Sequence, residues 1–153
     1  MALDGLRTED RITVEAPWGR VFEAAAQVER WPEFLAHYRW VRAGSWRGQV
    51  REVRMSASRS GIPCWWTAQQ RLERARKRIH YSHTRSAFTR GMDVWWLLTA
   101  LGPRRTGIVL THVMPPEGPL LSLFRRHVVG SFFVHAIAQK TLAGVKRRAE
   151  GIE

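Results

Sequence analysis

Cysteine is nearly absent from this sequence, and long hydrophobic runs are absent too. The single cysteine, Cys64, excludes an internal disulfide and fits a reducing compartment. No apolar stretch approaches the roughly 20 residues that a membrane-spanning helix needs, and segment 1–10 has no apolar core of a secretory signal. We therefore expect a cytoplasmic protein without stable membrane insertion, folded as a single domain over residues 1–153.

Acidic residues are also scarce, at 13 against 25 lysines and arginines, which gives a net charge of +12. Such a charge attracts nucleic-acid phosphates, so an adaptor for nucleic acid or for an acidic partner is one hypothesis. However, the basic residues are spread from Arg7 to Arg148. No zinc-ligand spacing, glycine-rich RNA motif or basic heptad helix accompanies them. We therefore interpret the charge as a solvated surface and expect no nucleic-acid partner.

Tryptophan, in contrast, is abundant, with eight residues. Segment 31–45, WPEFLAHYRWVRAGS, is especially rich in aromatic side chains. Such side chains can fill a core or line a pocket for a flat ligand. The pattern favours a structural role for Trp31 and Phe34, whereas Tyr38 and Trp40 stay open between core and pocket wall.

The apolar periodicity predicts an α+β fold. Ile12 and Val14 alternate with polar residues, as in a half-buried strand, and Pro17 suits the first turn of the helix that follows. Pro32 disfavours helical geometry at Trp31 and begins a second short helical turn. Six further strands, separated by turn residues, are predicted at about 38–44, 49–58, 62–72, 76–84, 92–101 and 106–114, and one long helix at 119–148.

Six or seven antiparallel strands with one long helix must curve around that helix to bury its apolar face. We therefore predict a curved sheet wrapped around the C-terminal helix, with two short helices after the first strand. The space between sheet and helix is the default ligand site. On the long helix the predicted inward face consists of Leu120, Phe124, Val128, His135, Ala138, Leu142 and Val145.

A second apolar line on the same helix, Val129, Phe133 and Ile137, leaves two alternatives open. If the sheet covers only the first face, this line is exposed and marks a homodimer contact or a membrane-surface contact. If loops cover it, it belongs to the core.

Alternation along each strand predicts which side chains face the cavity. Ile62 and Cys64 take the inner face of their strand, and Tyr38 and Trp40 are assigned inward because Arg39 favours water. The expected ligand-binding residues are Tyr38, Trp40, Met55, Trp66, Gln70, Trp96, Leu110, Phe124, Val128 and His135.

Polar side chains on the inner faces are the most informative, because a buried polar group needs a partner that a ligand can supply. A lone histidine on an apolar face is usually a core residue. Several polar groups that converge on one cavity indicate a site instead; here they include Arg59, Tyr81, His83 and His112. No carboxylate is assigned to their face, and His80 and His83 point to opposite faces of one strand, so no metal site is expected.

Motifs along the chain, taken in order, resemble one superfamily. Segment 12–34, ITVEAPWGRVFEAAAQVERWPEF, resembles the opening of the START-like polyketide cyclase/dehydrase superfamily, which also includes coenzyme Q-binding proteins. Segment 91–113, GMDVWWLLTALGPRRTGIVLTHV, is similar to a hairpin of that family. Segment 132–150, FFVHAIAQKTLAGVKRRAE, resembles the last helix of actinobacterial polyketide-cyclase-like proteins. The matching positions in the first segment are Ala16, Pro17, Val21, Phe22, Glu29, Trp31, Pro32 and Phe34.

The resemblance implies the helix-grip fold and a hydrophobic, aromatic or polyketide-like ligand. As an aromatase/cyclase, the protein would catalyse aldol cyclisation and dehydration without a cofactor. Arg59 would then stabilise a developing enolate, His112 or His83 would move protons, and Tyr81 would donate a hydrogen bond. The alternative is a non-catalytic carrier or chaperone of a quinone or lipid.

Overall fold

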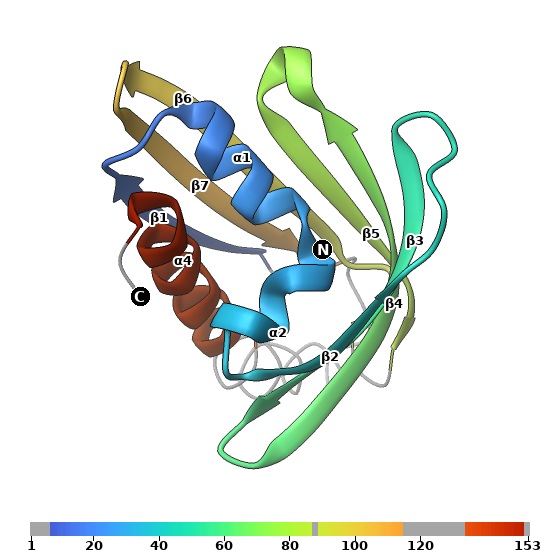
Figure 1. Ribbon diagram of the computed structural model, residues 1–153. Helices are drawn as coiled ribbons and strands as arrows, with labels where there is room; N and C mark the ends of the chain where they lie inside the picture. Colours follow the sequence, from blue (N-terminus) through green and yellow to red (C-terminus); the bar gives the residue numbers. More distant parts are fainter. Residues whose placement is uncertain (1–6, 87–88, 115–133, 152–153) are drawn as a thin grey trace, which may run out of the picture.

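The computed structural model describes residues 7–86, 89–114 and 134–151 (Figure 1). Its elements follow the predicted order of one strand, short helices, a strand meander and a C-terminal helix. The helical elements are α1 (Trp18–Ala26), the 3-10 turn η1 (Val28–Arg30), α2 (Trp31–Phe34), the 3-10 turn η2 (Arg74–Arg76) and α4 (His135–Glu150). The strands are β1 (Arg7–Val14), β2 (Tyr38–Ala43), β3 (Val50–Arg59), β4 (Ile62–Glu73), β5 (Arg78–Ser86), β6 (Asp93–Gly102) and β7 (Arg105–Val113).

The seven strands form one sheet in the order β1-β7-β6-β5-β4-β3-β2, with every neighbouring pair antiparallel. Only β1 pairs with a strand distant in sequence, β7, and this pairing sets the first strand beside the last. Figure 1 shows the sheet curving around α4, with α1 and α2 on the same side of it. The predicted helix-grip arrangement is confirmed.

The inner face of the sheet and one face of α4 form the core. Inner residues of β3 to β7 are buried as the alternation predicts, for example Met55, Ile79 and Leu110. The buried face of α4 is Ile137, Ala138, Thr141, Leu142, Gly144, Val145 and Ala149. Ala138, Leu142 and Val145 were predicted to face inward and do so, but His135 lies on the exposed side of the helix. The predicted helix residues 119–133, with Leu120, Phe124 and Val128, lie outside the described residues.

Three local expectations are wrong. Trp31 is helical, with φ −54° and ψ −41°, although Pro32 follows it; its indole Nε1 donates a hydrogen bond to the carbonyl of Ala24 and holds it in place. Trp40 is 38% exposed, because a register shift between Tyr38 and Trp40 sets Trp40 opposite Ser56 on the outer face. Ile62 is 49% exposed, because it lies at the tip of the β3–β4 hairpin.

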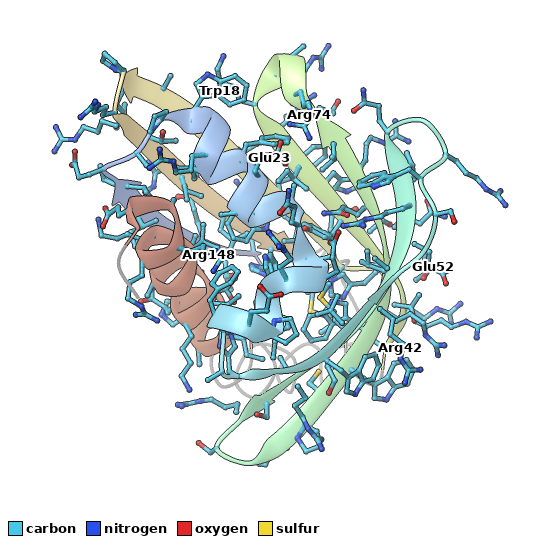
Figure 2. The ribbon with its side chains drawn as sticks, viewed as in Figure 1. Trp18, Glu23, Arg42, Glu52, Arg74 and Arg148 are labelled. Atoms are coloured by element: carbon cyan, nitrogen blue, oxygen red, sulfur yellow. The ribbon has the colours of Figure 1, made fainter. Side chains whose placement is uncertain are left out.

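Arginines spread over the surface make local pairs with acidic and aromatic side chains. Arg74 pairs with Glu23 of α1 and lies over the ring of Phe22 at 4.9 Å, and Figure 2 shows Arg74 and Glu23 together. Arg148 at the end of α4 lies over the ring of Phe34 at 5.2 Å. Among the described helices, none is long and apolar enough to cross a membrane.

The line expected to mark a dimer contact falls mostly outside the described residues, since Val129 and Phe133 lie there. Its third member, Ile137, is buried at 9% exposure against the sheet. A homodimer therefore stays a prediction, and Ile137 does not contribute an exposed surface to it.

Alanine substitutions of two helical glycines should change the stability in opposite directions. A Cβ on Gly144 of α4 would lie 2.0 Å from Cδ2 of Leu35, whereas one on Gly19 of α1 would meet nothing within 4 Å. Gly144→Ala should lower the free energy of unfolding by about 1–3 kcal/mol through overpacking. Gly19→Ala should raise it by about 0.5–1 kcal/mol through helix propensity. Urea unfolding of both variants measures this, and a Gly144→Ala protein as stable as the wild type would contradict the packing of α4 on Leu35.

Candidate functional site

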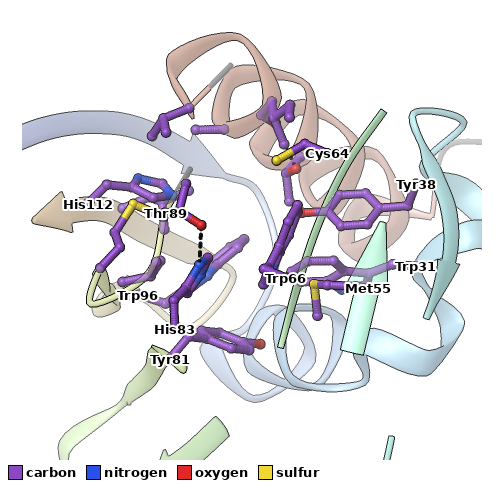
Figure 3. A pocket seen from close by; sticks show the side chains of 17 residues that line it. Trp31, Tyr38, Met55, Cys64, Trp66, Tyr81, His83, Thr89, Trp96 and His112 are labelled. Atoms are coloured by element: carbon purple, nitrogen blue, oxygen red, sulfur yellow. Dashed lines mark hydrogen bonds between the residues drawn. The ribbon is translucent and has the colours of Figure 1, made fainter. Parts of the chain in front are cut away.

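A cavity lies between the inner face of the sheet and α4 (Figure 3). Each strand from β2 to β7 contributes at least one side chain to its wall, and the edge strand β1 contributes none. Helix α4 closes the opposite side. The apolar and aromatic part of the wall consists of Trp31, Tyr38, Met55, Cys64, Trp66, Met92, Val94, Trp96, Leu110, Val134, Ile137 and Ala138. Its other lining residues are Tyr81, His83, Thr89, His112 and Thr141.

Aromatic rings in this wall contact one another. Trp31 packs edge-on against Tyr38, with ring centroids 5.0 Å apart, and lies 6.0 Å from Trp96. Trp66 stacks on the imidazole of His83, at 5.6 Å and an interplanar angle of 10°. Tyr38, which the sequence left open, therefore serves both the core and the pocket wall, and so does Trp31, which was expected to be structural.

His83 is fixed by the chain segment that leads into β6. Its backbone N–H donates to the carbonyl of Met92, and its own carbonyl accepts from the N–H of Gly91. These bonds fold the segment back over β5, so Oγ1 of Thr89 lies 2.9 Å from Nδ1 of His83. Figure 3 shows this bond at the edge of the cavity. Thr89 is 4% exposed, and sequence patterns missed it because it belongs to no strand.

His112 lines the cavity from β7 with a different environment. Its Nδ1 is buried and has no hydrogen-bond partner among the described residues. Of the four ring nitrogens of His83 and His112, only this one is both buried and unpaired. Both side chains line the cavity, and neither Nε2 has a hydrogen-bond partner among the described residues.

Burial holds the ionisable groups of the cavity in their neutral forms. It lowers the pKa of His83 to about 3, with a further contribution from His112, and lowers the pKa of His112 to about 4. It raises the pKa of the Cys64 thiol to about 11, and it raises the pKa values of Tyr38 and Tyr81 well above the ordinary tyrosine range. At neutral pH the described wall offers neutral donors and acceptors in an apolar setting.

A buried polar network behind the cavity occupies the hydroxyl of Tyr81. Gln70 donates from Nε2 to that hydroxyl at 2.9 Å, and the hydroxyl donates to the carbonyl of Ala25 at 3.3 Å. Gln70 in turn accepts at 2.6 Å from Nε of Arg51, and Arg51 pairs with Glu29 at 2.7 Å. Tyr81 thus presents its ring to the cavity while its polar end binds protein groups, which contradicts its expected role as a hydrogen-bond donor to the ligand.

Arg51 is the buried arginine that the alternation should have revealed. It is 6% exposed and shares the inner-face parity of Val53 and Met55. Arg59, the expected enolate stabiliser, lies at the end of β3, is partly exposed, and is not among the described residues that line the cavity. Its role stays a prediction.

The expected ligand-binding residues divide into three groups. The cavity wall includes Tyr38, Met55, Trp66, Trp96 and Leu110. Gln70 is buried but belongs to the polar network, and Trp40 faces outward. His135 is directed to β1 instead, where its Nδ1 lies 2.8 Å from the buried carboxylate of Asp10. Phe124 and Val128 lie outside the described residues.

Asp10 also corrects the expectation that no carboxylate faces inward. It shares the parity of Ile12 and Val14 and is 2% exposed. Its Oδ1 also accepts from the side chain of Gln139 in α4. Within residues 7–86, 89–114 and 134–151, no three His, Cys, Asp or Glu side chains are placed to hold a metal ion.

Known proteins match the chain at the levels of both sequence and fold. A Streptomyces violaceoruber protein, the granaticin polyketide synthase bifunctional cyclase/dehydratase, is 30% identical over 108 residues, which are 69% of this chain. The match spans about a third, 33%, of that relative's length.

Two solved structures share the fold. The Zhui aromatase/cyclase from Streptomyces sp. R1128 superimposes with a TM-score of 0.77 and 22% identity, over 94% of this chain and 95% of that one. A START superfamily protein from Mycobacterium smegmatis superimposes with a TM-score of 0.69 and 14% identity, over 95% and 94% of the two chains. The sequence pattern of a family described as polyketide cyclase / dehydrase and lipid transport matches residues 14–139. The chain therefore belongs to the polyketide cyclase/dehydrase and lipid transport family.

Proposed function

We propose that the protein binds an aromatic or polyketide-like molecule in the cavity between sheet and α4, and that it catalyses aldol cyclisation and dehydration there. The observation that supports this is the pair His83 and His112, whose side chains both line one largely apolar cavity. The family membership and the cyclase/dehydratase relative support the same chemistry. A cytoplasmic location and one ligand-binding domain over residues 1–153 belong to this proposal.

The cavity suits proton transfer without a cofactor. Aldol closure needs a base that removes a proton next to a carbonyl and a donor that stabilises the resulting enolate. Two neutral imidazoles supply both, and the apolar surroundings strengthen each hydrogen bond that they make. The stacked wall of Trp66 and the ring of Trp96 orient a flat substrate by contact.

Binding is tested with 1,8-dihydroxyanthraquinone, a flat tricyclic ketone, followed by quenching of tryptophan fluorescence. Ala138 lines the cavity and Ala136 does not. Ala138→Leu should weaken binding about tenfold, since overpacking costs about 1–3 kcal/mol and 1.4 kcal/mol is a factor of ten. Ala136→Leu, two residues away on α4, should bind as the wild type does. Equal affinities for both variants would place the ligand elsewhere.

Catalysis is tested by exchange of the methyl protons of 2-acetylphenol in heavy water, followed by NMR. The wild type should accelerate this exchange, and His83→Gln and His112→Gln should each reduce the enzymatic rate roughly 100-fold, the usual contribution of a positioned acid or base. A protein that binds the anthraquinone but exchanges no protons is a carrier, the alternative function, and this result would overturn the catalytic part of the proposal.

A further inference from the structure

The two cavity histidines differ in what surrounds Nδ1. In His83 this nitrogen lies 2.9 Å from the Thr89 hydroxyl oxygen. In His112 it is buried with no described partner. A neutral imidazole carries one proton, on either Nδ1 or Nε2. The surroundings of Nδ1 therefore decide whether Nε2 is a donor or an acceptor.

The hydrogen bonds of Thr89 give the direction at His83. Oγ1 of Thr89 donates its proton to Oγ of Ser86 at 2.8 Å, and Oγ of Ser86 also accepts from the backbone N–H of Thr89 at 3.0 Å. A hydroxyl has a single proton, so a Thr89 that donates to Ser86 accepts from Nδ1 of His83. This arrangement of hydrogen bonds puts the proton of His83 on Nδ1 and leaves its Nε2 an acceptor.

The opposite holds at His112. A proton on its Nδ1 would be a buried donor without an acceptor, and orphaned buried N–H groups are rarer in proteins than acceptors with unused lone pairs. The proton is therefore favoured on Nε2 of this cavity-lining histidine. His112 then offers the cavity a donor where His83 offers an acceptor.

We propose that Thr89 is a positioning residue that holds His83 as the proton acceptor, while His112 is the hydrogen-bond donor, in the aldol and dehydration chemistry proposed for this cavity. This inference rests on the proposed function for its substrate, but the two tautomers are properties of the ligand-free protein.

The assigned roles give a balanced reaction. Nε2 of His83 takes the α-proton, the electron pair of the C–H bond becomes the enolate, and the carbonyl oxygen receives a hydrogen bond from Nε2–H of His112. The enolate then expels the β-hydroxyl group, which leaves as water with the proton that His83 returns. A carbon–carbon double bond remains, and both imidazoles are restored without an oxidant or a reductant.

The tautomers are measured directly by long-range proton–nitrogen NMR correlations of the imidazole rings in the ligand-free, isotope-labelled protein at neutral pH. We expect the Nδ1–H form for His83 and the Nε2–H form for His112. Thr89→Val removes the acceptor with little change of volume and should shift His83 to the Nε2–H form, with His112 unchanged. Thr89→Ser should retain the wild-type pattern. The same tautomer in both rings, or a His83 unaffected by Thr89→Val, would overturn the proposal.

The consequence for catalysis is measured on the exchange of 2-acetylphenol. At saturating ketone, Thr89→Val should slow exchange by at least about tenfold with a KM within about twofold, because the acceptor nitrogen is lost and the cavity is not. Thr89→Ser should restore the rate. If the wild type catalyses no exchange, the proposed function fails and the NMR result still decides the tautomers. If Thr89→Val exchanges as fast as the wild type, the positioning role is wrong.

Discussion

Replacing Gln70 by Leu is expected to remove about 3 kcal/mol from the free energy of unfolding, a large part of the roughly 5–15 kcal/mol typical of a domain. Gln70 is fully buried at 0% exposure. Its side chain accepts from Arg51 and donates both to Tyr81 and to the carbonyl of Ala26. Leu fills a similar volume but leaves Nε of a buried guanidinium without an acceptor, and that charge cannot be shed.

Gln69→Leu is the matched control, because Gln69 is the next residue on β4 and its side chain is exposed on the outer face. Its free energy of unfolding, measured in urea, should stay within about 0.5 kcal/mol of that of the wild type. If Gln70→Leu unfolds at the same midpoint as this control, the network does not stabilise the fold. Glu29, whose carboxylate lies half in solvent, would then carry the pairing of Arg51 alone.

Most of the fold could be predicted because burial on one face of a strand leaves a period-2 pattern in sequence. Ile79, Tyr81 and His83 alternate with polar neighbours, and all three are buried on the inner face. The failures lie where this rule is locally broken. The register shift at the start of β2 turns Trp40 outward, and no sequence pattern near Trp40 predicts such a shift.

The sequence could predict which side chains face the cavity, but not which hydrogen bonds they make. His83 and His112 were placed at the cavity by parity alone. The hydrogen bonds of the Tyr81 hydroxyl with Gln70 and Ala25 could not be predicted, because these partners are 11 and 56 residues away in sequence. Thr89 was missed for a similar reason, since its place beside His83 depends on how the β5–β6 connection folds back. Arg51, in contrast, follows the alternation of Val53 and Met55 and was within reach of the sequence.

Acidification from pH 8 to pH 5 is expected to destabilise the protein by about 4 kcal/mol through His83 and His112 alone. Burial lowers the pKa of each imidazole, to about 3 and about 4, whereas both titrate near 6.5 in the unfolded chain. Between the folded and unfolded pKa values, each imidazole is protonated in the unfolded state and neutral in the folded state. The free energy of unfolding therefore falls as the pH falls. At pH 5 each group lies about 1.5 units below its unfolded pKa, which costs about 2 kcal/mol.

The window from pH 8 to pH 5 also leaves Glu29 ionised. Burial raises the pKa of this carboxyl, but the hydrogen bond and charge of Arg51 outweigh that effect and hold the pKa below its ordinary value of 4.5. His37 adds a loss in the same direction, because burial and the charge of Lys140 lower its pKa to about 4. Urea unfolding of the wild type and of the double variant His83→Gln/His112→Gln at both pH values isolates the two cavity groups. The variant should lose about 4 kcal/mol less than the wild type between pH 8 and pH 5. Equal losses in the two proteins would show that these imidazoles accept protons in the folded state, and the neutral cavity on which the proposed proton transfer depends would be wrong.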